Sequence, residues 1–361
     1  MNFTQKSKEH LDACRFCWMC RHICPIGNAT GQERNTARAR ALGLSLVARE
    51  AVGYSEDIVD NVYECALCGA CVKECVTGWD PVMFTKEARL GAALDGKLPP
   101  YVMKMVDAAM KTGNVYGAKP DERLVGKISK SAAGTDTLFF LGADARYKTP
   151  ACAGEAIDLL LLLGATFTTL ENEPDSGYGM DFLVGAAAET KAIAENCAKT
   201  LNAYKRVICY DPADAKMFRR EYKEWGVEIS AEILTFTAFL DIMIKDRNVK
   251  KSGCFFTPQD SPILARDLEE TEPVRNILSK IGTVTEMLLN RRDTMLAGNL
   301  IMNEYMPLVM ERVAADRWIN AQNVGAKILV TESPAEYAML YKTKPSDIEI
   351  VTIEEAVRKC L

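Results

Sequence analysis

Hydrophobic and polar positions divide the chain into a helical N-terminal part and a C-terminal part of alternating strands and helices. Apolar residues recur at helical spacing over 32–50 and 55–65, and Ser55 is suited to cap the second of these helices. Further helical patterns over 86–94 and 101–111 are separated by breakers that contain Gly and Pro. The first third of the chain is therefore predicted to be helical.

The pattern changes at 135–144, where a short apolar strand is predicted. A helix is expected over 150–165, a second strand over 166–171, a helix over 186–204 and a strand at 206–211. Strands and helices that alternate at this length are typical of a layered α/β domain with a parallel sheet.

The C-terminal part also repeats itself. FFLGAD at 139–144 is echoed by FFTPQD at 255–260, and VICYDPAD at 207–214 by ILVTESPAE at 328–336. The second copy lies about 120 residues after the first in both cases, which indicates two related modules.

Together these patterns predict an α+β multidomain chain. Its expected parts are an N-terminal α-helical domain at 1–95, a helical connector at 96–134, and parallel-sheet modules at 135–250 and 251–361. A methionine-rich segment at 287–310 is predicted to be helical core.

Composition changes this picture mainly through cysteine. The 361 residues include 13 cysteines but only two histidines, His10 and His22, and the formal net charge is −5. This charge gives no reason to expect nucleic acid or anionic lipid as a partner. The first residues lack the apolar core of a signal peptide, and no apolar run approaches the ~20 residues that span a bilayer. We therefore expect a cytoplasmic protein without a membrane span, whose thiols stay reduced.

Eight cysteines form two runs with the spacing C-x2-C-x2-C-x3-C. The runs are CRFCWMCRHIC, with Cys14, Cys17, Cys20 and Cys24, and CALCGACVKEC, with Cys65, Cys68, Cys71 and Cys75. Such a run places three thiolates around one [4Fe–4S] cluster, and in two-cluster ferredoxins the fourth binds the other cluster. We therefore assign two clusters, one held by Cys14, Cys17, Cys20 and Cys75, the other by Cys65, Cys68, Cys71 and Cys24.

Zinc is the main alternative to iron–sulfur clusters, but zinc sites usually pair two C-x2-C knuckles instead of two runs of four. Pro25 ends the first ligand loop through its fixed φ, whereas the second run continues with Val76. Gly69 allows the backbone to approach closely near sulfide. His22 lies inside the first run, yet four thiolates already complete each site.

Side chains near the runs have ordinary explanations. Phe16 and Trp18 are predicted to shield a cluster from water. The arginine-rich stretch at 34–41 is predicted to be a solvated face, with a docking patch for an acidic partner as the alternative.

The C-terminal part has no histidine, which excludes a Ser-His-Asp or Cys-His apparatus there, and it has no complete nucleotide-binding fingerprint. Its isolated cysteines are predicted to be buried structural thiols: Cys152, Cys197, Cys209, Cys254 and Cys360.

Two such runs on helices, followed by two repeated α/β modules, resemble the D-type heterodisulfide reductase family. Its relatives include the iron–sulfur subunits of glycolate oxidase, of lactate-utilisation systems and of anaerobic glycerol-3-phosphate dehydrogenase. The cysteine-rich part by itself is similar to the α-helical ferredoxin domain of succinate dehydrogenase iron–sulfur subunits. The resemblance implies an α-helical ferredoxin domain with two [4Fe–4S] clusters at 1–95 and degenerate cysteine-rich modules after it.

The resemblance ends at the thiols of the modules. In the family each module carries a Cys-Cys-Gly and a Cys-Pro-x-Cys element. The corresponding segments here are Asp175-Ser176-Gly177 and Asp211-Pro212-Ala213-Asp214 in the first module, and Leu296-Ala297-Gly298 and Ser333-Pro334-Ala335-Glu336 in the second. The glycines and prolines indicate that the turns are kept while the thiol chemistry is lost. Asp175, Asp211 and Asp214 could hold a divalent metal, but turn and capping roles are the ordinary case for Asp.

We therefore expect an iron–sulfur electron-transfer subunit of an anaerobic oxidoreductase complex, with no catalytic residue of its own. The resemblance implies an FAD-linked partner subunit of the 2-hydroxy acid or alcohol dehydrogenase type, docked on the α/β half. A ferredoxin or an electron-transfer flavoprotein is the expected second carrier. The alternatives are a catalytic subunit with its active site in the α/β modules, and a structural assembly subunit.

Overall fold

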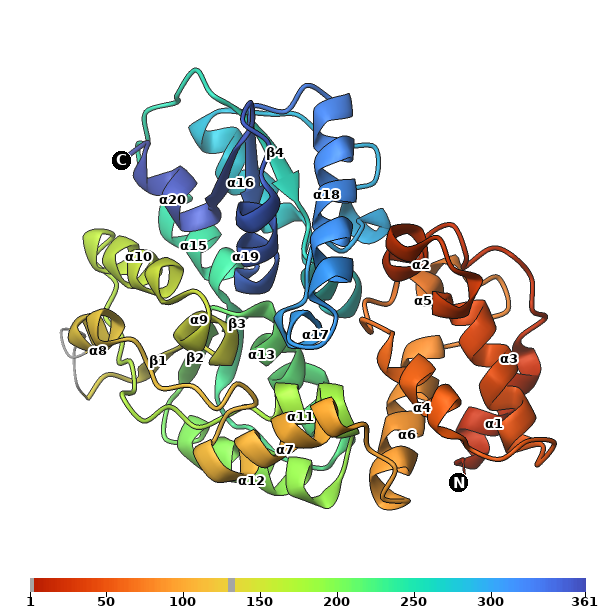
Figure 1. Cartoon of the computed structure of the whole chain (residues 1–361). Coiled ribbons are helices and arrows are strands. Elements are labelled where there is room, and N and C mark those ends of the chain that lie inside the picture. Colours follow the sequence, from red (N-terminus) through yellow and green to blue (C-terminus); the bar gives the residue numbers. More distant parts are fainter. Residues whose placement is uncertain (1–2, 129–133) are drawn as a thin grey trace.

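A computed structural model describes residues 3–128 and 134–361 and shows a smaller helical part beside a larger α/β part (Figure 1). The smaller part contains both cysteine runs. Its elements are α1 (Gln5–Ala13), α2 (Pro25–Thr30), η1 (Glu33–Asn35), α3 (Ala37–Ala48), α4 (Glu56–Tyr63), α5 (Ala70–Glu74) and α6 (Pro81–Leu94). The helices predicted over 32–50, 55–65 and 86–94 are therefore present.

Proline and capping residues determine where the helices near the cysteine runs begin. Pro25 and Pro81 occupy the first positions of α2 and α6, where the fixed φ of proline suits a helix start. The Asp80 carboxylate caps α6 by accepting two backbone N–H bonds at 2.9 and 3.0 Å. Ser55 precedes α4 in an extended conformation, but its hydroxyl makes no capping hydrogen bond.

Two helices connect the parts: α7 (Pro100–Thr112), which packs against the α/β part, and α8 (Glu122–Ile128). The first module then forms a parallel sheet of order β1-β2-β3, with Leu138 opposite Val207 and Val207 opposite Ile233. Its elements are β1 (Thr137–Phe140), α9 (Ala143–Tyr147), α10 (Pro150–Leu162), α11 (Tyr178–Val184), α12 (Ala188–Leu201), β2 (Arg206–Cys209), α13 (Pro212–Lys216), η2 (Met217–Glu221), α14 (Tyr222–Glu224), β3 (Glu232–Thr235) and α15 (Phe236–Ile244).

The second module forms a parallel sheet of order β5-β4-β6-β7. Its elements are β4 (Phe255–Gln259), η3 (Ile263–Asp267), α16 (Glu272–Ile281), β5 (Thr283–Val284), η4 (Arg291–Asp293), α17 (Leu300–Asn303), α18 (Pro307–Asn323), β6 (Ile328–Thr331), α19 (Pro334–Thr343), β7 (Glu349–Thr352) and α20 (Ile353–Arg358). The pairs β1–β2 and β4–β6 occupy corresponding places, as the sequence repeat predicts. The mixed fold of helices and parallel sheets is confirmed.

Two local predictions are wrong. The strand expected over 166–171 is reduced to one bridge between Leu138 and Thr168, because Arg146 takes the next carbonyl groups, those of Leu170 and Glu171.

The methionine-rich segment is helical only from α17 onward; residues 287–299 run mainly as a loop, apart from the short turn η4. Carbonyl groups of this loop accept side-chain hydrogen bonds instead of helical ones: Leu289 from Arg317, Thr294 from Arg266 and Met295 from Gln259.

A shared hydrophobic core joins the helical part to the α/β part. It includes Val62 of α4, Phe182 of α11 and Trp318 of α18. The Tyr63 hydroxyl donates to the Leu183 carbonyl at 2.8 Å across this join. Figure 1 shows α2 beside α18 and α6 beside α11, and these pairs make close contacts.

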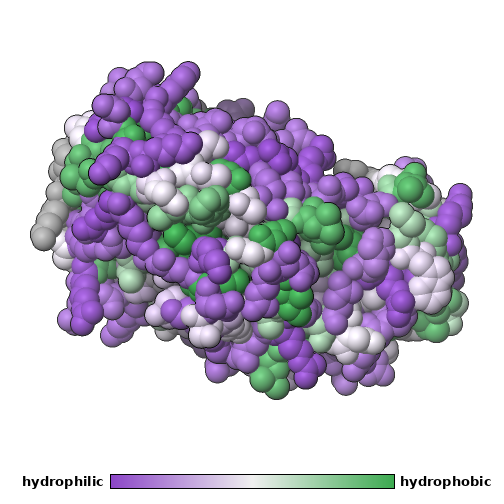
Figure 2. All heavy atoms as spheres, turned by 90° about the horizontal axis from the view of Figure 1, so that it is seen from above, coloured by the Kyte–Doolittle hydropathy of each residue, from purple (hydrophilic) through white to green (hydrophobic). Residues whose placement is uncertain are grey.

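The surface seen from above is mainly hydrophilic, with apolar side chains scattered over both parts (Figure 2). None of the helices in the described ranges is both long and apolar enough to cross a membrane.

Candidate iron–sulfur site

The two cysteine runs begin with the same local backbone. Phe16 and Leu67, each two residues after the first cysteine, have positive φ values of 49° and 52°. The Phe16 N–H donates to Cys14 Sγ at 3.4 Å, and the Leu67 N–H donates to Cys65 Sγ at 3.5 Å. Left-handed backbone is uncommon for residues with side chains. Its recurrence at equivalent positions indicates that both loops wrap their N–H groups around a sulfur atom.

The last cysteines of the runs also share one conformation. Cys24 has φ −76° and ψ 113°, and Cys75 has φ −76° and ψ 111°. The Gly27 N–H donates to Cys24 Sγ at 3.5 Å, and Cys75 Sγ lies 3.2 Å from the Thr77 hydroxyl. Extended backbone at the fourth position carries the chain away from each loop.

Cys24 lies with the second run. Burial raises the pKa of Cys71 well above its ordinary value, and the nearby thiols of Cys68, Cys65 and Cys24 raise it further. Burial also raises the pKa of Cys68 to about 11, an effect that Arg266 opposes and that Cys24 and Cys65 reinforce. We call Cys24, Cys65, Cys68 and Cys71 the second thiol group.

Cys75 lies beside the first run. Burial raises the pKa of Cys14, and the thiols of Cys75 and Cys17 add to the effect. The pKa of Cys20 rises to about 11 through burial and the thiols of Cys14 and Cys17, with a smaller contribution from Cys24. We call Cys14, Cys17, Cys20 and Cys75 the first thiol group. Each group thus combines three thiols of one run with one of the other, as the assigned ligand sets do; their role as ligands stays a prediction.

These donors fit a [4Fe–4S] cluster. Each group supplies four soft thiols, and backbone N–H groups already point at three of the sulfur atoms. Within residues 3–128 and 134–361, no three His, Cys, Asp or Glu side chains lie close enough to hold a single metal ion. A cubane binds one thiolate at each of four separate irons, so its ligands stand farther apart than those of one ion.

Comparison with known proteins agrees with this geometry. Residues 10–79, which contain both runs, match the 4Fe-4S dicluster domain family. The N-terminal part is a ferredoxin-like iron–sulfur domain. The chain is also 25% identical over 295 residues, or 73% of its length, to the "Probable iron-sulfur-binding oxidoreductase FadF" of Bacillus subtilis (strain 168). It covers 41% of the length of that relative.

The first thiol group of the ferredoxin-like domain lies at the surface. Cys17 is exposed, and Trp18 is 59% exposed instead of forming a buried shield. The guanidinium groups of Arg21 and Arg38 lie 5.1 and 4.6 Å from the centroid of the Trp18 ring. His22 is exposed as well. A partner molecule can therefore approach this group directly.

The second thiol group lies between the ferredoxin-like domain and the α/β half. Arg40 of the arginine-rich stretch is 4% exposed, so the predicted solvated face is wrong at this residue. Arg89 of α6 donates to the Cys65 carbonyl, and Arg266 of η3 donates to the Cys68 carbonyl. Sequence analysis missed these arginines, because Arg266 is 198 positions from Cys68 and no local pattern links them.

A groove of about 860 Å³ opens beside the second thiol group. Gly69 and Val72 of the second run line one side, and Trp225 of the first module lines the other. Lys86 of α6 also lines the groove and forms ion pairs with Asp181 and Glu221 at 2.7 and 2.8 Å. The groove has the size of a ligand or cofactor site and lies at a boundary between two parts of the chain.

The turns that replace the family's cysteine elements have structural roles in the first module. Asp211 caps α13 by accepting the Ala213 N–H at 2.9 Å, and Asp175 accepts the Gly177 N–H at 2.5 Å. The Ser176 hydroxyl donates to Asp214 at 2.5 Å.

The turn at 211–214 and both altered turns of the second module line a cavity of about 50 Å³ that the second run also lines. Its lining includes Leu67, Cys68, Asp211, Gly298, Ser333 and Glu336. One altered turn of the first module and both of the second therefore lie opposite the same thiol group.

Proposed function

We propose that the chain is an electron-transfer subunit that holds two [4Fe–4S] clusters, one in each thiol group. The observation that carries the proposal is the exchange of fourth cysteines, with Cys24 beside the second run and Cys75 beside the first. The name of the B. subtilis relative, an iron-sulfur-binding oxidoreductase, supports a redox role. So does the resemblance to D-type heterodisulfide reductases and to the iron–sulfur subunits of glycolate oxidase.

The clusters, when bound, would supply one-electron chemistry. The protein gives the two groups different surroundings. Cys17 and Trp18 leave the first group open to a diffusing carrier, whereas Arg40 and Arg266 cover the second. The open first group suits a diffusing carrier, and the covered second group suits a partner that stays bound at the groove; this difference supports a relay.

The proposed partner is an FAD-linked subunit that oxidises a 2-hydroxy acid or an alcohol. We propose that it docks on the α/β half at the groove beside Gly69 and Val72, where its flavin would come close to the second thiol group. The groove offers an apolar wall with Met83 and the Trp225 indole, and a charged rim that includes Arg220. Arg220→Glu should weaken binding of a co-purifying flavoprotein, whereas Lys205→Glu, on the exposed end of the first sheet, should not.

A catalytic role is the second candidate, favoured by the cavity between the altered turns and Cys68. At about 50 Å³ it has room for only a few water molecules, which leaves little space for an organic substrate. Substrate turnover by the purified chain without any partner would support this alternative.

Metal analysis tests the proposal directly. Protein purified without oxygen should contain about eight irons and eight sulfides per chain, four of each per thiol group. EPR of the reduced protein should show two interacting [4Fe–4S] signals. A content near four irons would contradict two clusters, and one near twelve would place a further cluster in the α/β half.

A further inference from the structure

Buried arginines surround the second thiol group. Arg40 on α3 is 4% exposed, donates to the Asn35 carbonyl at 3.0 Å and hydrogen-bonds to the Cys24 thiol. Arg89 on α6 is fully buried and donates to the Cys65 carbonyl at 2.6 Å. Neither arginine forms an ion pair with a carboxylate in the described part of the chain. Their positive charges are therefore not offset where they lie.

Arg266 approaches the same group from the second module. Its Nε donates to the Cys68 carbonyl at 2.9 Å, and its Nη1 donates to the Thr294 carbonyl at 2.7 Å. Its Nη2 is buried without a hydrogen-bond partner, and within residues 3–128 and 134–361 the side chain forms no ion pair. Gly69 has a φ of +74°, which favours glycine, and a β-carbon there would be in ordinary contact with Arg266 Nε at 3.7 Å, so the guanidinium lies directly against the ligand loop.

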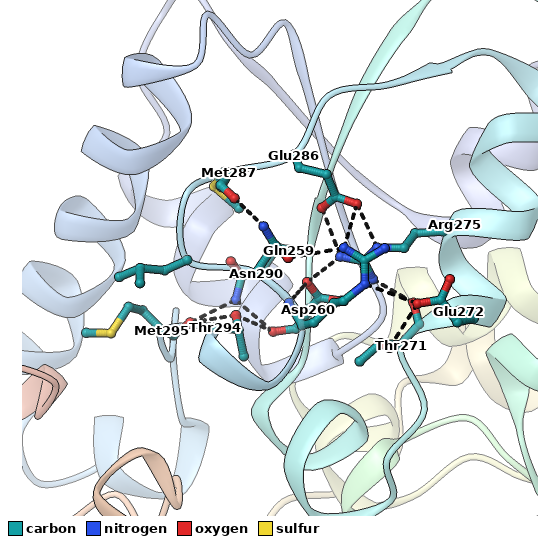
Figure 3. A network of polar contacts seen from close by, with 12 residues as sticks. Gln259, Asp260, Thr271, Glu272, Arg275, Glu286, Met287, Asn290, Thr294 and Met295 are labelled. Atoms are coloured by element: carbon teal, nitrogen blue, oxygen red, sulfur yellow. Dashed lines mark hydrogen bonds and ion pairs between the residues drawn. The ribbon is translucent and has the colours of Figure 1, made fainter. Parts of the chain in front are cut away.

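The loop whose Thr294 carbonyl accepts from Arg266 is itself held by a network of polar contacts around Arg275 (Figure 3). Arg275 forms a two-point ion pair with Asp260 at 2.6 and 2.9 Å and a second with Glu286 at 2.7 and 2.9 Å. The Thr294 hydroxyl donates to the Asp260 carbonyl at 2.9 Å. Because Thr294 also accepts from Arg266, the network keeps the Arg266 guanidinium in one position.

The first thiol group has weaker positive surroundings. Arg38, which lies near Cys14, pairs with Glu33 at 2.8 Å. Arg21 pairs with the same carboxylate at 2.7 Å. Both arginines are partly exposed, so water and salt screen what remains of their charge.

This difference bears on the reduction potentials. A [4Fe–4S] cluster gains one negative charge on reduction, and a fixed cation in a water-poor environment stabilises that charge strongly. Burial alone acts in the opposite direction, because it disfavours any additional charge. The order of the two potentials therefore depends on whether the three guanidiniums, which have no carboxylate partners, outweigh burial at the second group.

We propose that Arg40, Arg89 and Arg266 hold the second cluster at a higher reduction potential than the first. An electron that enters at the exposed first group then comes to rest at the second, beside the groove. This inference rests on the proposed function, because it requires a cluster in each thiol group.

Anaerobic redox titration followed by EPR tests the inference in the full chain. The Cys75→Ser variant, which should keep only the second cluster intact, identifies that cluster's signal. In the wild-type protein the second cluster should be reduced first. Arg266→Gln should raise its ratio of oxidised to reduced form about tenfold at a fixed ambient potential, which is ~59 mV for one electron.

Two further variants separate charge from structure. Arg266→Lys keeps the charge and should restore most of the potential. Arg312→Gln is the matched control: Arg312 also reaches from the α/β half to a carbonyl of the ferredoxin-like domain, that of Ala29 at 3.5 Å, but not to a ligand run. It should leave both potentials unchanged.

The outcomes distinguish this inference from the proposed function. Fewer than about eight irons in the wild-type protein would refute the two-cluster function itself. With a full complement of iron, any of three results would overturn the role of the arginines. The first cluster could be reduced before the second, or the potential of the second cluster could stay unchanged in Arg266→Gln. Equal shifts of that potential in Arg266→Gln and Arg266→Lys would be the third. If the Arg266→Gln protein loses iron, the titration is repeated with Arg40→Gln. The order of the two potentials in the wild-type protein tests the inference in either case.

Discussion

At the scale of single residues, the proposed two-cluster function makes the fourth cysteines decide which cluster depends on which run. We predict that Cys24→Ser damages the second cluster and Cys75→Ser the first, because each lies beside the run to which it does not belong. Each variant should keep one intact [4Fe–4S] signal in EPR and lose up to half of its iron. If Cys24→Ser disturbed only the cluster of Cys14, Cys17 and Cys20, the exchange would be wrong.

A buried carboxyl group should make stability depend on pH. Burial raises the pKa of Glu354 from 4.5 to about 7, while hydrogen bonds such as that from the Tyr210 hydroxyl at 2.6 Å lower it. The folded state therefore binds more protons than the unfolded state between these values. The stability that Glu354 contributes is fully present below about pH 4.5 and is lost as pH rises through 7.

We predict that this loss is on the order of 3 kcal/mol and that Glu354→Gln removes it. The amide oxygen can still accept from Tyr210, so packing is kept. Denaturant unfolding at pH 5 and pH 8 should show a smaller difference in the variant than in the wild-type protein. Glu349, a half-exposed carboxyl on β7, provides the control: Glu349→Gln should leave the difference in unfolding free energy between pH 5 and pH 8 unchanged. The prediction is contradicted if Glu354→Gln shows the same difference as the wild-type protein.

At the scale of elements, one hydroxyl joins α4 to the last turn of α11. Tyr63→Phe removes the donor to the buried Leu183 carbonyl and should lower the free energy of unfolding by about 1–3 kcal/mol. Tyr101→Phe is the control, because its hydroxyl bonds the exposed Asp60 at only 3.4 Å and should cost less than ~0.5 kcal/mol. Denaturant unfolding of both variants measures the difference; equal losses would show that the ring packing, and not the Leu183 bond, responds.

The elements that could be predicted from sequence are those whose ends are set locally. The helices α3, α4, α6 and α7 follow their apolar spacing, the strands β1 and β2 follow their short apolar runs, and β4 and β6 follow the repeat of those runs. The strand expected at 166–171 and the helix expected over 287–299 fail for one reason. Arginine side chains distant in sequence, among them Arg146 and Arg266, take the carbonyl groups that a ladder or helix would need.

The candidate site divides in the same way. Spacing alone singled out the eight cysteines and proposed the exchange of Cys24 and Cys75. It gave no indication of Arg89 and Arg266, and it placed Arg40 on a solvated face. These arginines reach the site through tertiary contacts between segments far apart in the chain, and a local sequence pattern does not predict such contacts.

At the scale of the whole molecule, the ferredoxin-like domain and the α/β half share one core. A fragment of residues 134–361 would uncover Phe182, which is 1% exposed in the full chain and whose ring lies against Arg89 of α6. We predict that this fragment unfolds at a lower temperature than the full chain and binds a hydrophobic dye. Thermal unfolding and dye fluorescence measure both. A fragment as stable as the full chain would show that the join adds little.

If the proposed ligand sets hold, the exchange of fourth cysteines also determines when the two clusters can be completed during synthesis. The second thiol group is incomplete until Cys71 has been made, and the first until Cys75 has. A nascent chain that has passed the first run therefore has only three of the four thiols for its nearest cluster, and both sets become complete within a few residues of each other. Delivery of iron and sulfide would then be one step that cannot begin before Cys75 has been made, and Arg266 joins the site nearly two hundred residues later.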